Sequence, residues 1–431
     1  MAESRLLKPE TDGLTRRERY RKFMWAFNPT ASPRRLIKEG LLLQDLHRSV
    51  FQSFAARADL EPGSQQLIIG GIGSGKTTEL LMAEDWLNGQ ENCIPRYIDV
   101  SAETDLTDLR SGALVAALGL HLVNLIRIEN ETASIPKTRK DEIAKAKKDV
   151  EEFALGKTTR VWVEDFYEEW EPEPDDEDGG PPGHFVTSSF PGKLTPPVPR
   201  LKKDIQSISD PLVLLLQYLT TSGGKKRDLV VLFDGLDRLI TPEKFWSVAH
   251  QDLRILKKLK ISVLATAPLT VLYEGREIAD QFDRVHHLAT LPSDGPGQSQ
   301  LESVLLRRGG DLLLSPRQMA LLCESSGGVL RDLITLARDS AEEAYIDGRD
   351  RVADSNIESA VAQLGTSYLR GLSARQRNRL RSINKNSEFD FKQPGNMELL
   401  ATRRVLEYSA TEFSVHPALM SVLSKLESAD G

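Results

Sequence analysis

The chain has 431 residues, of which 40% are hydrophobic and 28% are charged, a composition typical of an ordinary soluble globular protein. This length exceeds what one compact core holds, so two or three domains are expected. The formal net charge of -7 argues against a protein whose whole surface is coated in nucleic acid.

The two cysteines, Cys93 and Cys323, lie far apart in apolar segments and indicate reduced core residues, neither a disulfide nor a metal site. Residues 1–10 lack the apolar stretch of a signal peptide. The longest apolar runs, such as Leu212–Leu219, are too short to cross a bilayer. We therefore expect a cytoplasmic protein without a membrane partner.

The first part of the chain begins with a basic segment, residues 1–40. Apolar residues at helical spacing predict a helix over Leu41–Ala58. A short apolar strand, a glycine-rich loop and a helix are then expected over residues 65–87, followed by a strand at Ile94–Ser101 and a long helix over residues 105–128.

The composition changes between about residues 130 and 210. A highly charged helical pattern is followed there by an acidic stretch rich in proline and glycine. We expect an insertion, partly disordered, because this stretch cannot bury much apolar surface. Two interpretations stay open: a solvated loop without a role, and an arm that docks a partner.

The alternating pattern resumes after Pro211, with strands predicted at Asp228–Asp234, Ile261–Ala267 and Arg284–Leu291 and helices between them. Apolar strands that alternate with helices indicate an α/β fold with a parallel sheet covered on both faces.

Beyond Pro292 the patterns are mainly helical. Helices are expected at Ser315–Ser325, Val329–Tyr345 and Ser355–Leu364, and the last has a capping-box pattern in Ser355 and Glu358. The tail from Thr366 shows two helical patterns, then a short hairpin with a closing helix. The expected domains are a core over 41–310 containing the insertion, a helical lid over 311–365, and a C-terminal domain over 366–431.

The glycine-rich loop fits the pattern G-x-x-x-x-G-K-[ST]. Its residues are Gly70, Gly71, Ile72, Gly73, Ser74, Gly75, Lys76 and Thr77, with Thr78 next. Such a loop directs backbone N–H groups at a phosphate, and glycine keeps side chains out of the way. Lys76 would contact the β- and γ-phosphates and the Thr77 hydroxyl would bind Mg²⁺. The following helix adds its positive end.

Two acids follow a buried strand in the segment "LVVLFDGLDRL". Asp234, at the strand end, would hold Mg²⁺ through water opposite Thr77. Asp237, three residues later, would orient and polarise the attacking water. Ordinary turn or helix-capping aspartates are the alternative for both.

These residues resemble the Walker A and Walker B motifs of P-loop ATPases of the AAA+ and STAND groups, and "DGLD" is similar to the NACHT branch. The resemblance implies ATP and Mg²⁺ as ligands and a homo-oligomer. In most AAA+ proteins a catalytic glutamate follows the magnesium aspartate, but here Gly235 does. Either Asp237 takes the place of that glutamate or hydrolysis is slow. NACHT-like proteins usually carry a further acid where this chain has Arg238, and this departure argues against rapid turnover.

Three further residues match the same resemblance. Thr266 ends a strand where AAA+ proteins place a polar sensor 1 residue. Arg331 matches the sensor 2 arginine of replication-initiator AAA+ proteins, which contacts the γ-phosphate from a helical lid. Arg284 matches an arginine that acts on the ATP of a neighbouring subunit. Ordinary strand or surface residues are the alternative for each.

The tail carries a cluster of basic residues without an acid among them: Arg370, Arg375, Arg377, Arg379, Arg381 and Lys385. Residues 366–431 resemble a winged-helix domain, which could bind the DNA backbone. STAND proteins use such domains as internal brakes, an equally open interpretation. His416 would then reach a bound nucleotide, or would be an ordinary residue of the wing.

The sequence therefore predicts an ATP-switched or ATP-driven oligomeric ATPase that acts on a protein or DNA partner. Two alternatives stay open: an ATP-binding scaffold without hydrolysis, and a DNA-binding regulator in which ATP sets the oligomeric state. A GTPase is disfavoured because the chain lacks an [NT]-K-x-D motif. A small-molecule kinase is disfavoured because the lid pattern with Arg331 would have no purpose.

Overall fold

A computed structural model describes most of the chain: residues 13–42, 50–107, 109–130, 137–155, 205–221, 226–239, 241–273, 278, 281–386 and 388–430. The chain divides into two compact units. The first contains residues 1–54, 67–85 and 267–431, and the second contains residues 55–66 and 86–266. Each is described by itself.

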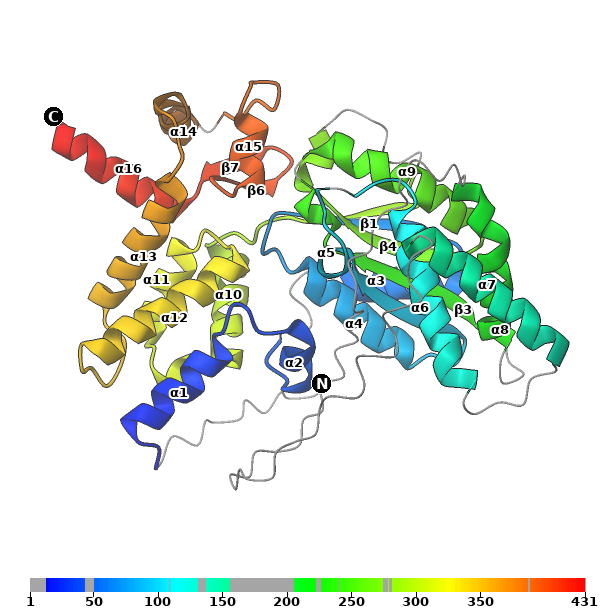
Figure 1. The fold of residues 1–431 in the computed structure, drawn as a ribbon. Helices are drawn as coiled ribbons and strands as arrows, with labels where there is room; N and C mark the ends of the chain where they lie inside the picture. The colour runs from blue at the N-terminus through cyan, green and yellow to red at the C-terminus, as the bar shows by residue number, and fades with distance from the viewer. Residues whose placement is uncertain are drawn as a thin grey trace. The chain divides into compact units, whose positions relative to one another are not determined.

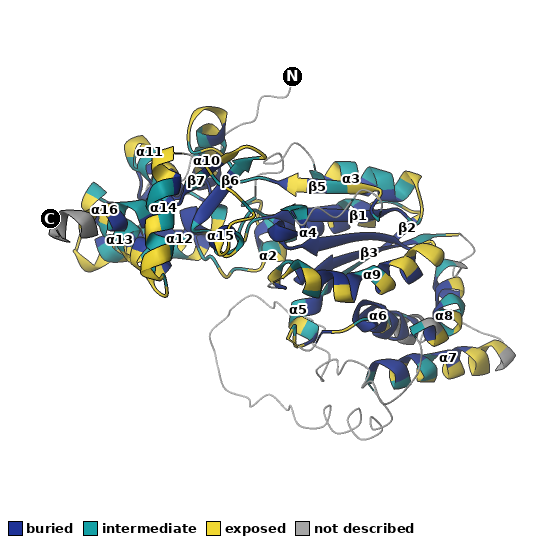
Figure 2. Cartoon of the chain, turned by 90° about the horizontal axis from the view of Figure 1, so that it is seen from above, coloured by how far each residue is buried: buried dark blue, intermediate teal, exposed yellow. Residues whose placement is uncertain are grey.

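The strands of the α/β part form one five-stranded parallel sheet in the order β2-β3-β4-β1-β5 (Figure 1). Their bounds are Gln65–Gly70 for β1, Cys93–Asp99 for β2, Asp228–Asp234 for β3, Ser262–Ala267 for β4 and Arg284–Leu288 for β5. Every residue of β1 and β4 is buried, and β3 is dark blue along its length in Figure 2. Strands buried on both faces explain why the sequence shows near-continuous apolar runs. The predicted α/β fold is confirmed.

In the second unit, β3 is paired with β2 on one side and with β4 on the other. The β2–β3 register sets Asp99 opposite Asp234, so the carboxyl ends of these strands meet at one edge. The helices of this unit are α5 (Val100–Glu103), α6 (Ala113–Asn130), α7 (Lys137–Leu155), α8 (Ser209–Thr221) and α9 (Pro242–Lys258), while α3 (Val50–Leu60) crosses between the units.

Helix α7 lies inside the range expected to be an insertion, yet it contributes to the core of the second unit. It contacts α6 and α8, and it buries Ile143, Val150 and Phe153 along one face. The expectation that this stretch buries little apolar surface was wrong for α7, because its apolar residues recur at helical spacing among the charges. Its acidic, proline-rich continuation, residues 156–204, lies outside the described residues.

The first unit contains a helical layer around one apolar cluster. Its helices are α10 (Gly295–Arg307), α11 (Pro316–Ser325), α12 (Leu330–Ile346) and α13 (Asp354–Leu369). The helix predicted to start at Ser355 starts one residue earlier. The predicted capping box was wrong, because Asn356, not Glu358, accepts a hydrogen bond from the backbone N–H of the residue before the helix, Ala353.

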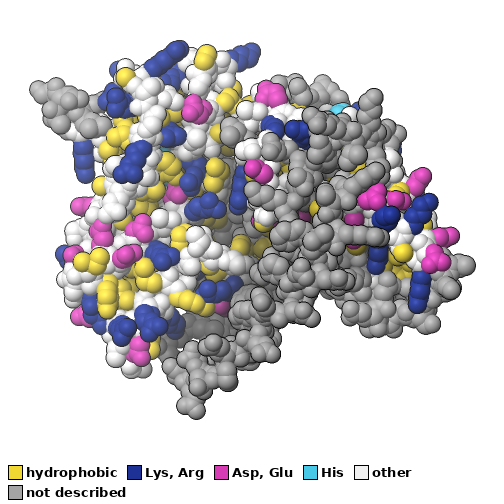
Figure 3. All heavy atoms as spheres, in the orientation of Figure 1, with side chains coloured by type: hydrophobic (Ala, Val, Ile, Leu, Met, Phe, Trp, Pro, Cys, Tyr) yellow, Lys and Arg dark blue, Asp and Glu magenta, His cyan; other side chains and the backbone are white. Residues whose placement is uncertain are grey.

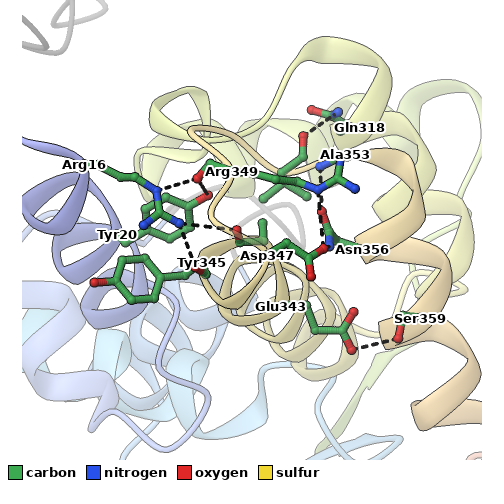
Figure 4. A network of polar contacts seen from close by, with 12 residues as sticks. Arg16, Tyr20, Gln318, Glu343, Tyr345, Asp347, Arg349, Ala353, Asn356 and Ser359 are labelled. Carbon is green, nitrogen blue, oxygen red and sulfur yellow. Dashed lines mark hydrogen bonds and ion pairs between the residues drawn. The ribbon is translucent and has the colours of Figure 1, made fainter.

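The basic N-terminal segment forms two helices, α1 (Arg16–Ala26) and α2 (Pro33–Lys38). Helix α1 belongs to the same apolar cluster through Tyr20 and Phe23, and so does Phe27, the residue after it. Figure 4 shows Arg16 and Tyr20 directed at the end of α12. The Arg16 guanidinium donates to the carbonyls of Tyr345 and Arg349, each at 2.7 Å, and the Tyr20 hydroxyl donates to the Arg349 carbonyl at 3.0 Å. A cation thus satisfies carbonyls at a helix C-terminus.

The C-terminal part of the first unit contains α14 (Ala374–Asn386), α15 (Asn396–Ala401), a hairpin of β6 (Val405–Ser409) and β7 (Glu412–Val415), and α16 (Pro417–Asp430). The predicted hairpin and closing helix are confirmed. Helix α16 packs against α13, and Gly365 allows the two helices to approach closely at Ala418. A Cβ at position 365 would come within 2.1 Å of the Ala418 carbonyl oxygen.

Among the described helices, none has both the length and the apolar character that a membrane crossing requires.

A buried carboxylate fixes the start of α6. Asp252 on α9 is fully buried, and its oxygens accept hydrogen bonds from the backbone N–H groups of Gly112, Leu114 and Val115 at 2.7, 2.8 and 3.3 Å. Burial raises the pKa of Asp252 to about 6, against these hydrogen bonds, which lower it. The Asp252 carboxylate thus provides hydrogen-bond acceptors for the free N–H groups at the start of α6, as the side chain of an N-cap residue does in other helices.

Replacing Asp252 with alanine leaves three buried N–H groups without an acceptor. We expect a loss of about 2–4 kcal/mol in the free energy of unfolding of this region. Hydrogen exchange of the Leu114 and Val115 amides should accelerate by roughly 30-fold or more. The matched control is Arg254→Ala, an exposed position on the same helix, and equal exchange rates in both variants would contradict the capping role.

Candidate nucleotide-binding site

The glycine-rich loop lies between β1 and α4 (Lys76–Asn88). Gly73 and Gly75 have φ angles of +85° and +99°, which L side chains rarely adopt. At Gly70 a Cβ would lie 2.6 Å from both the Leu288 carbonyl oxygen and the Ser74 Oγ. The three glycines are therefore required by the backbone path, and the strand–loop–helix arrangement predicted from the motif is present.

Lys76 lies inside the curve of this loop. The residue is only 5% exposed. Its Nζ donates hydrogen bonds to the carbonyl oxygens of Gly70 at 2.9 Å and Gly71 at 2.8 Å. An ammonium that is nearly buried and held by two carbonyls of a partly exposed loop is a concentrated positive charge, which suits a phosphate group. The residues present thus fit the triphosphate of a nucleotide.

Thr77 and Thr78 occupy the first turn of α4 and are partly buried. Glu79, the next residue, is buried and accepts a hydrogen bond from the backbone N–H of Phe51 at 3.0 Å. Burial raises the pKa of Glu79 to about 7, against the hydrogen bond from Phe51, which lowers it. Glu79 therefore connects the phosphate-loop helix to the start of α3.

The start of α12 contacts the loop at Gly73. A Cβ on Gly73 would lie 2.9 Å from the Arg331 Cβ and 3.4 Å from the Val329 Cγ1. Arg331 is the second residue of α12 and is exposed. Within the first unit, the structure therefore brings the predicted lid arginine next to Gly73 of the predicted phosphate loop, although the two residues are 258 positions apart in sequence.

The residue after Arg331 is the centre of a buried polar cluster. Asp332 is 3% exposed and accepts hydrogen bonds from the Tyr368 hydroxyl at 2.5 Å, from Arg403 Nη1 at 2.7 Å and from His416 Nε2 at 3.2 Å. Burial alone would raise the pKa of Asp332. The hydrogen bond from His416 and the charge of Arg403 outweigh burial and hold that pKa below 3.8.

His416 makes hydrogen bonds through both ring nitrogens. Its Nδ1 accepts from the backbone N–H of Ala418 at 3.2 Å, which leaves the proton on Nε2 for Asp332. The sequence left open whether this histidine reaches a nucleotide. In this structure it joins the C-terminal hairpin to α12.

A pocket adjoins the phosphate loop within the first unit. Its lining comes from the loop, from Leu269, from residues 289–291 after β5, from residues 328–330 at the start of α12, and from residues 400–407 of the C-terminal part. Its lining includes Gly71, Ile72, Ser74, Gly328, Val329, Arg403 and Leu406. The hairpin is also joined to the residues before α12 by the Tyr408 hydroxyl, which donates to the Gly327 carbonyl at 2.9 Å. The sequence offered such an approach only as one of two open interpretations, through the resemblance to STAND proteins, whose C-terminal domains act as internal brakes.

In the second unit the predicted magnesium aspartate is nearly buried. Asp234 is 4% exposed, and its Oδ1 accepts a hydrogen bond from the Gly235 N–H at 2.7 Å. Its Oδ2 accepts from the Tyr97 hydroxyl at 2.7 Å. Sequence reasoning missed Tyr97, although a polar hydroxyl two residues before the end of a neighbouring strand was a usable signal. Tyr97 fixes the orientation of the Asp234 carboxylate.

Thr266 and Asp237 lie close to the same turn. Thr266 is fully buried, and its Oγ1 accepts from the backbone N–H of Leu236 at 3.1 Å. Asp237 is partly exposed in the 3₁₀ turn η3 (Leu236–Arg238) that follows β3. The second unit thus groups three predicted residues, Asp234, Asp237 and Thr266, at the carboxyl ends of β3 and β4.

Arg284 is placed differently. It is exposed at the first residue of β5. Because the strands are parallel and the phosphate loop follows the last residue of β1, Arg284 lies at the opposite edge of the sheet from that loop. Arg284 is therefore not grouped with the phosphate loop, and both alternatives from the sequence stay open: a role toward a neighbouring subunit, and an ordinary surface residue.

Comparison with solved structures finds chains to which this one is similar along most of its length. The chain is similar to the Aeropyrum pernix ORC2 protein, at 14% identity and a TM-score of 0.43 over 94% of this chain and 98% of that one. It is also similar to Cdc6p from Pyrobaculum aerophilum, at 13% identity and a TM-score of 0.41 over 94% and 98% of the two chains. The Thermotoga maritima RuvB Holliday junction branch migration motor matches at 13% identity and a TM-score of 0.38, over 89% and 95%.

The glycine-rich loop after β1, the aspartate at the end of β3 and the parallel sheet agree with the α/β fold expected from the sequence. No protein-family model and no curated protein sequence matches the chain. The roles of individual residues in this chain therefore rest on their own geometry.

The contribution of Asp332 to stability should depend on pH. A depressed pKa means that ionised Asp332 contributes stability above pH 3.8, and that this contribution is lost as the pH falls through its lower folded-state pKa. Hydrogen exchange in β6 and β7 should therefore be constant near neutral pH and should accelerate on acidification through that range.

Asp332→Asn should accelerate the same exchange at pH 7, by an amount equivalent to about 2–4 kcal/mol, because Arg403 loses its counter-charge in a buried site. This variant should also show a smaller acceleration of hydrogen exchange in β6 and β7 when the pH is lowered. Asp350→Asn, which removes an exposed partner of Arg19, is the matched control. An unchanged hairpin in Asp332→Asn would contradict the role of the cluster.

Proposed function

We propose that this chain binds ATP through residues 70–78 and hydrolyses it. The observation that carries the proposal is Lys76, whose ammonium is held inside a loop that three glycines shape. Gly70, Gly71, Ile72, Gly73, Ser74 and Gly75 would direct backbone N–H groups at the phosphates, and Lys76 would neutralise the β- and γ-phosphates. The α4 N-terminus adds a favourable dipole.

Thr77 and Asp234 would hold Mg²⁺, Thr77 through its hydroxyl and Asp234 through water. The metal, when bound, would neutralise charge that develops on the phosphate oxygens. The Tyr97 hydrogen bond supports this role, because it fixes a nearly buried carboxylate in one orientation.

Four residues are proposed to act on the γ-phosphate or the attacking water. Asp237 would orient the water, and Thr266 would contact the γ-phosphate side as a sensor while holding the turn after β3. Arg331 would reach the γ-phosphate from the start of α12, a role that its position beside Gly73 supports. Arg284 would act on the ATP of a neighbouring subunit, which requires a homo-oligomer.

The chain would work as an oligomeric switch or remodeller on a partner protein. Arg331 and Asp332 are consecutive, so a change at the γ-phosphate reaches the residue that holds the C-terminal hairpin. This arrangement supports the idea that residues 366–431, proposed as a winged-helix domain, respond to the nucleotide. Cys93 and Cys323 are buried free thiols, which is consistent with a cytoplasmic protein.

Lys76→Ala should abolish ATP hydrolysis by the purified protein and weaken ATP binding by roughly 10-fold or more, because the variant lacks a buried counter-charge to the phosphates. Colorimetric phosphate release and titration with a fluorescent ATP analogue measure the two effects. Lys38→Ala, in the short helix α2, serves as the control and should match the wild type.

Two outcomes separate the alternatives. Wild-type protein that binds ATP tightly without releasing phosphate would favour an ATP-gated scaffold and contradict hydrolysis. Unchanged ATP binding in Lys76→Ala would contradict the assignment of the loop itself.

A DNA-binding role is supported by α14, which carries Arg375, Arg377, Arg379, Arg381 and Lys385 and has no acidic residue. Figure 3 shows Lys and Arg side chains gathered on the surface where Figure 1 places α14. Arg375 and Lys385 are exposed, and the three arginines between them are partly exposed. Such a row of cations would contact phosphates of duplex DNA and release counterions.

Replacing Arg375, Arg377 and Lys385 together with serine should weaken binding of duplex DNA and lower the slope of log affinity against log salt by about 0.9 for each phosphate that the variant no longer neutralises. Fluorescence anisotropy with a labelled duplex at several salt concentrations, with and without ATP, measures this. A variant with three lysines of α7 changed, Lys140, Lys145 and Lys148, controls for net charge. Equal weakening in both variants would contradict a specific role for α14.

A further inference from the structure

The N-terminal helix α1 has two faces of different character. One face buries Tyr20 and Phe23 in the apolar cluster of the first unit. The other face carries Arg17, Arg21 and Lys22, and all three residues are exposed. Arg17 and Arg21 are one helical turn apart, and like charges at this spacing destabilise a helix. The packing of α1 uses the opposite face, so it gives no reason for this row of cations.

An aromatic side chain lies on the same face as the cations. Trp25 follows Arg21 by one helical turn and Lys22 by three residues, and it is 47% exposed. The Arg35 guanidinium, from α2, lies over the Trp25 ring, with Cζ 3.6 Å from the ring centroid. Arg35 Nε also donates a hydrogen bond to Glu39 at 3.0 Å. The indole is therefore a flat, oriented group beside a row of cations.

The acidic residues nearby do not cancel this charge. Residues 13–40 include eight basic residues but only two acidic ones, Glu18 and Glu39. Glu39 is bound to α2, as described above. Glu18 accepts hydrogen bonds from the N–H of Thr15 at 2.8 Å and from its hydroxyl at 2.7 Å, within the capping box of α1. These hydrogen bonds, and to a lesser extent the charge of Arg21, hold the pKa of Glu18 below its usual value.

We propose that this face of α1, made of Arg17, Arg21, Lys22 and Trp25, binds single-stranded nucleic acid. The cations would contact phosphates of the strand, and an unpaired base would stack on the indole ring. The site lies within the first unit and is separate from α14, where duplex DNA is proposed to bind. Binding here requires neither ATP nor hydrolysis.

The chemistry of this face favours a single strand over other anionic partners. A duplex keeps its bases stacked on one another, so it would meet the cations but not the ring. A membrane is disfavoured because the apolar face with which α1 would enter the lipid is buried in the protein. An acidic polypeptide offers carboxylates to the cations but no flat group to the indole.

The role of the ring is tested with the full chain, without ATP, by fluorescence anisotropy with labelled oligothymidylate and oligouridylate. Trp25→Ala should weaken binding by about 5- to 150-fold, the range that stacking of one base on an aromatic side chain contributes. Trp25→Phe keeps an aromatic ring and should recover most of this loss. The oligomer that binds more tightly shows whether the strand is DNA or RNA, and either result supports the inference.

The role of the cations is tested by replacing Arg17, Arg21 and Lys22 together with glutamine, which preserves helix propensity. The slope of log affinity against log salt should fall by about 0.7 for each phosphate of the single strand that the variant no longer neutralises. Glutamine at the three α7 lysines named above removes the same charge elsewhere and should leave binding as in the wild type. This measurement keeps the inference testable even if Trp25→Ala fails to fold.

Four results would overturn the inference. The first is an affinity of folded Trp25→Ala within about twofold of wild type for both oligomers. The second is equal weakening by the α1 and α7 charge variants. The third and fourth concern other partners: vesicles of phosphatidylcholine and phosphatidylserine in equal parts, or poly-glutamate, whose binding Trp25→Ala weakens more than it weakens oligonucleotide binding. These would assign the face to a membrane or to an acidic protein.

Discussion

A single buried carboxylate, Asp332, determines how the parts of the first unit are held together. It receives hydrogen bonds from α13, from the turn before β6 and from the residue after β7. A carboxylate that is 3% exposed is stable as an ion only with such partners. The start of α12 is therefore fixed between the C-terminal hairpin on one side and Gly73 of the phosphate loop on the other.

This constraint gives consecutive residues different tasks. Arg331 is exposed beside the loop, where it is available to a phosphate, and Asp332 is buried among the partners that hold the hairpin. A ligand that draws Arg331 toward its phosphates acts on the same helical turn that carries Asp332. An equilibrium between two arrangements of the hairpin would then respond to the nucleotide through differential contacts at Arg331. In the second unit, Tyr97 and Asp99 play comparable parts at the end of β2, since each adds a polar group beside Asp234.

Local patterns in the sequence predicted the elements that depend on local chemistry. The phosphate loop, β3 and the helices of the lid follow from glycine spacing, apolar runs and helical periodicity. Helix α1 was missed because its basic residues hide three aromatic side chains that are buried only against the lid. Tyr97 and the partners of Asp332 were missed for another reason: their contacts join residues that are 36 to 137 positions apart. Asp234 became a site candidate through its place at the end of a buried strand. Arg331 needed the motif resemblance, since composition alone does not distinguish it from an ordinary surface residue.

The most direct test of the account is amide hydrogen exchange of the segment 70–78 in wild-type protein, with and without ATP–Mg²⁺. The account predicts that ATP protects these amides, because their N–H groups would donate to phosphate oxygens. It also predicts protection at the start of α12, next to Gly73. ATP that binds without changing exchange in residues 70–78 would contradict the assignment of the phosphate loop, on which every other proposed role depends.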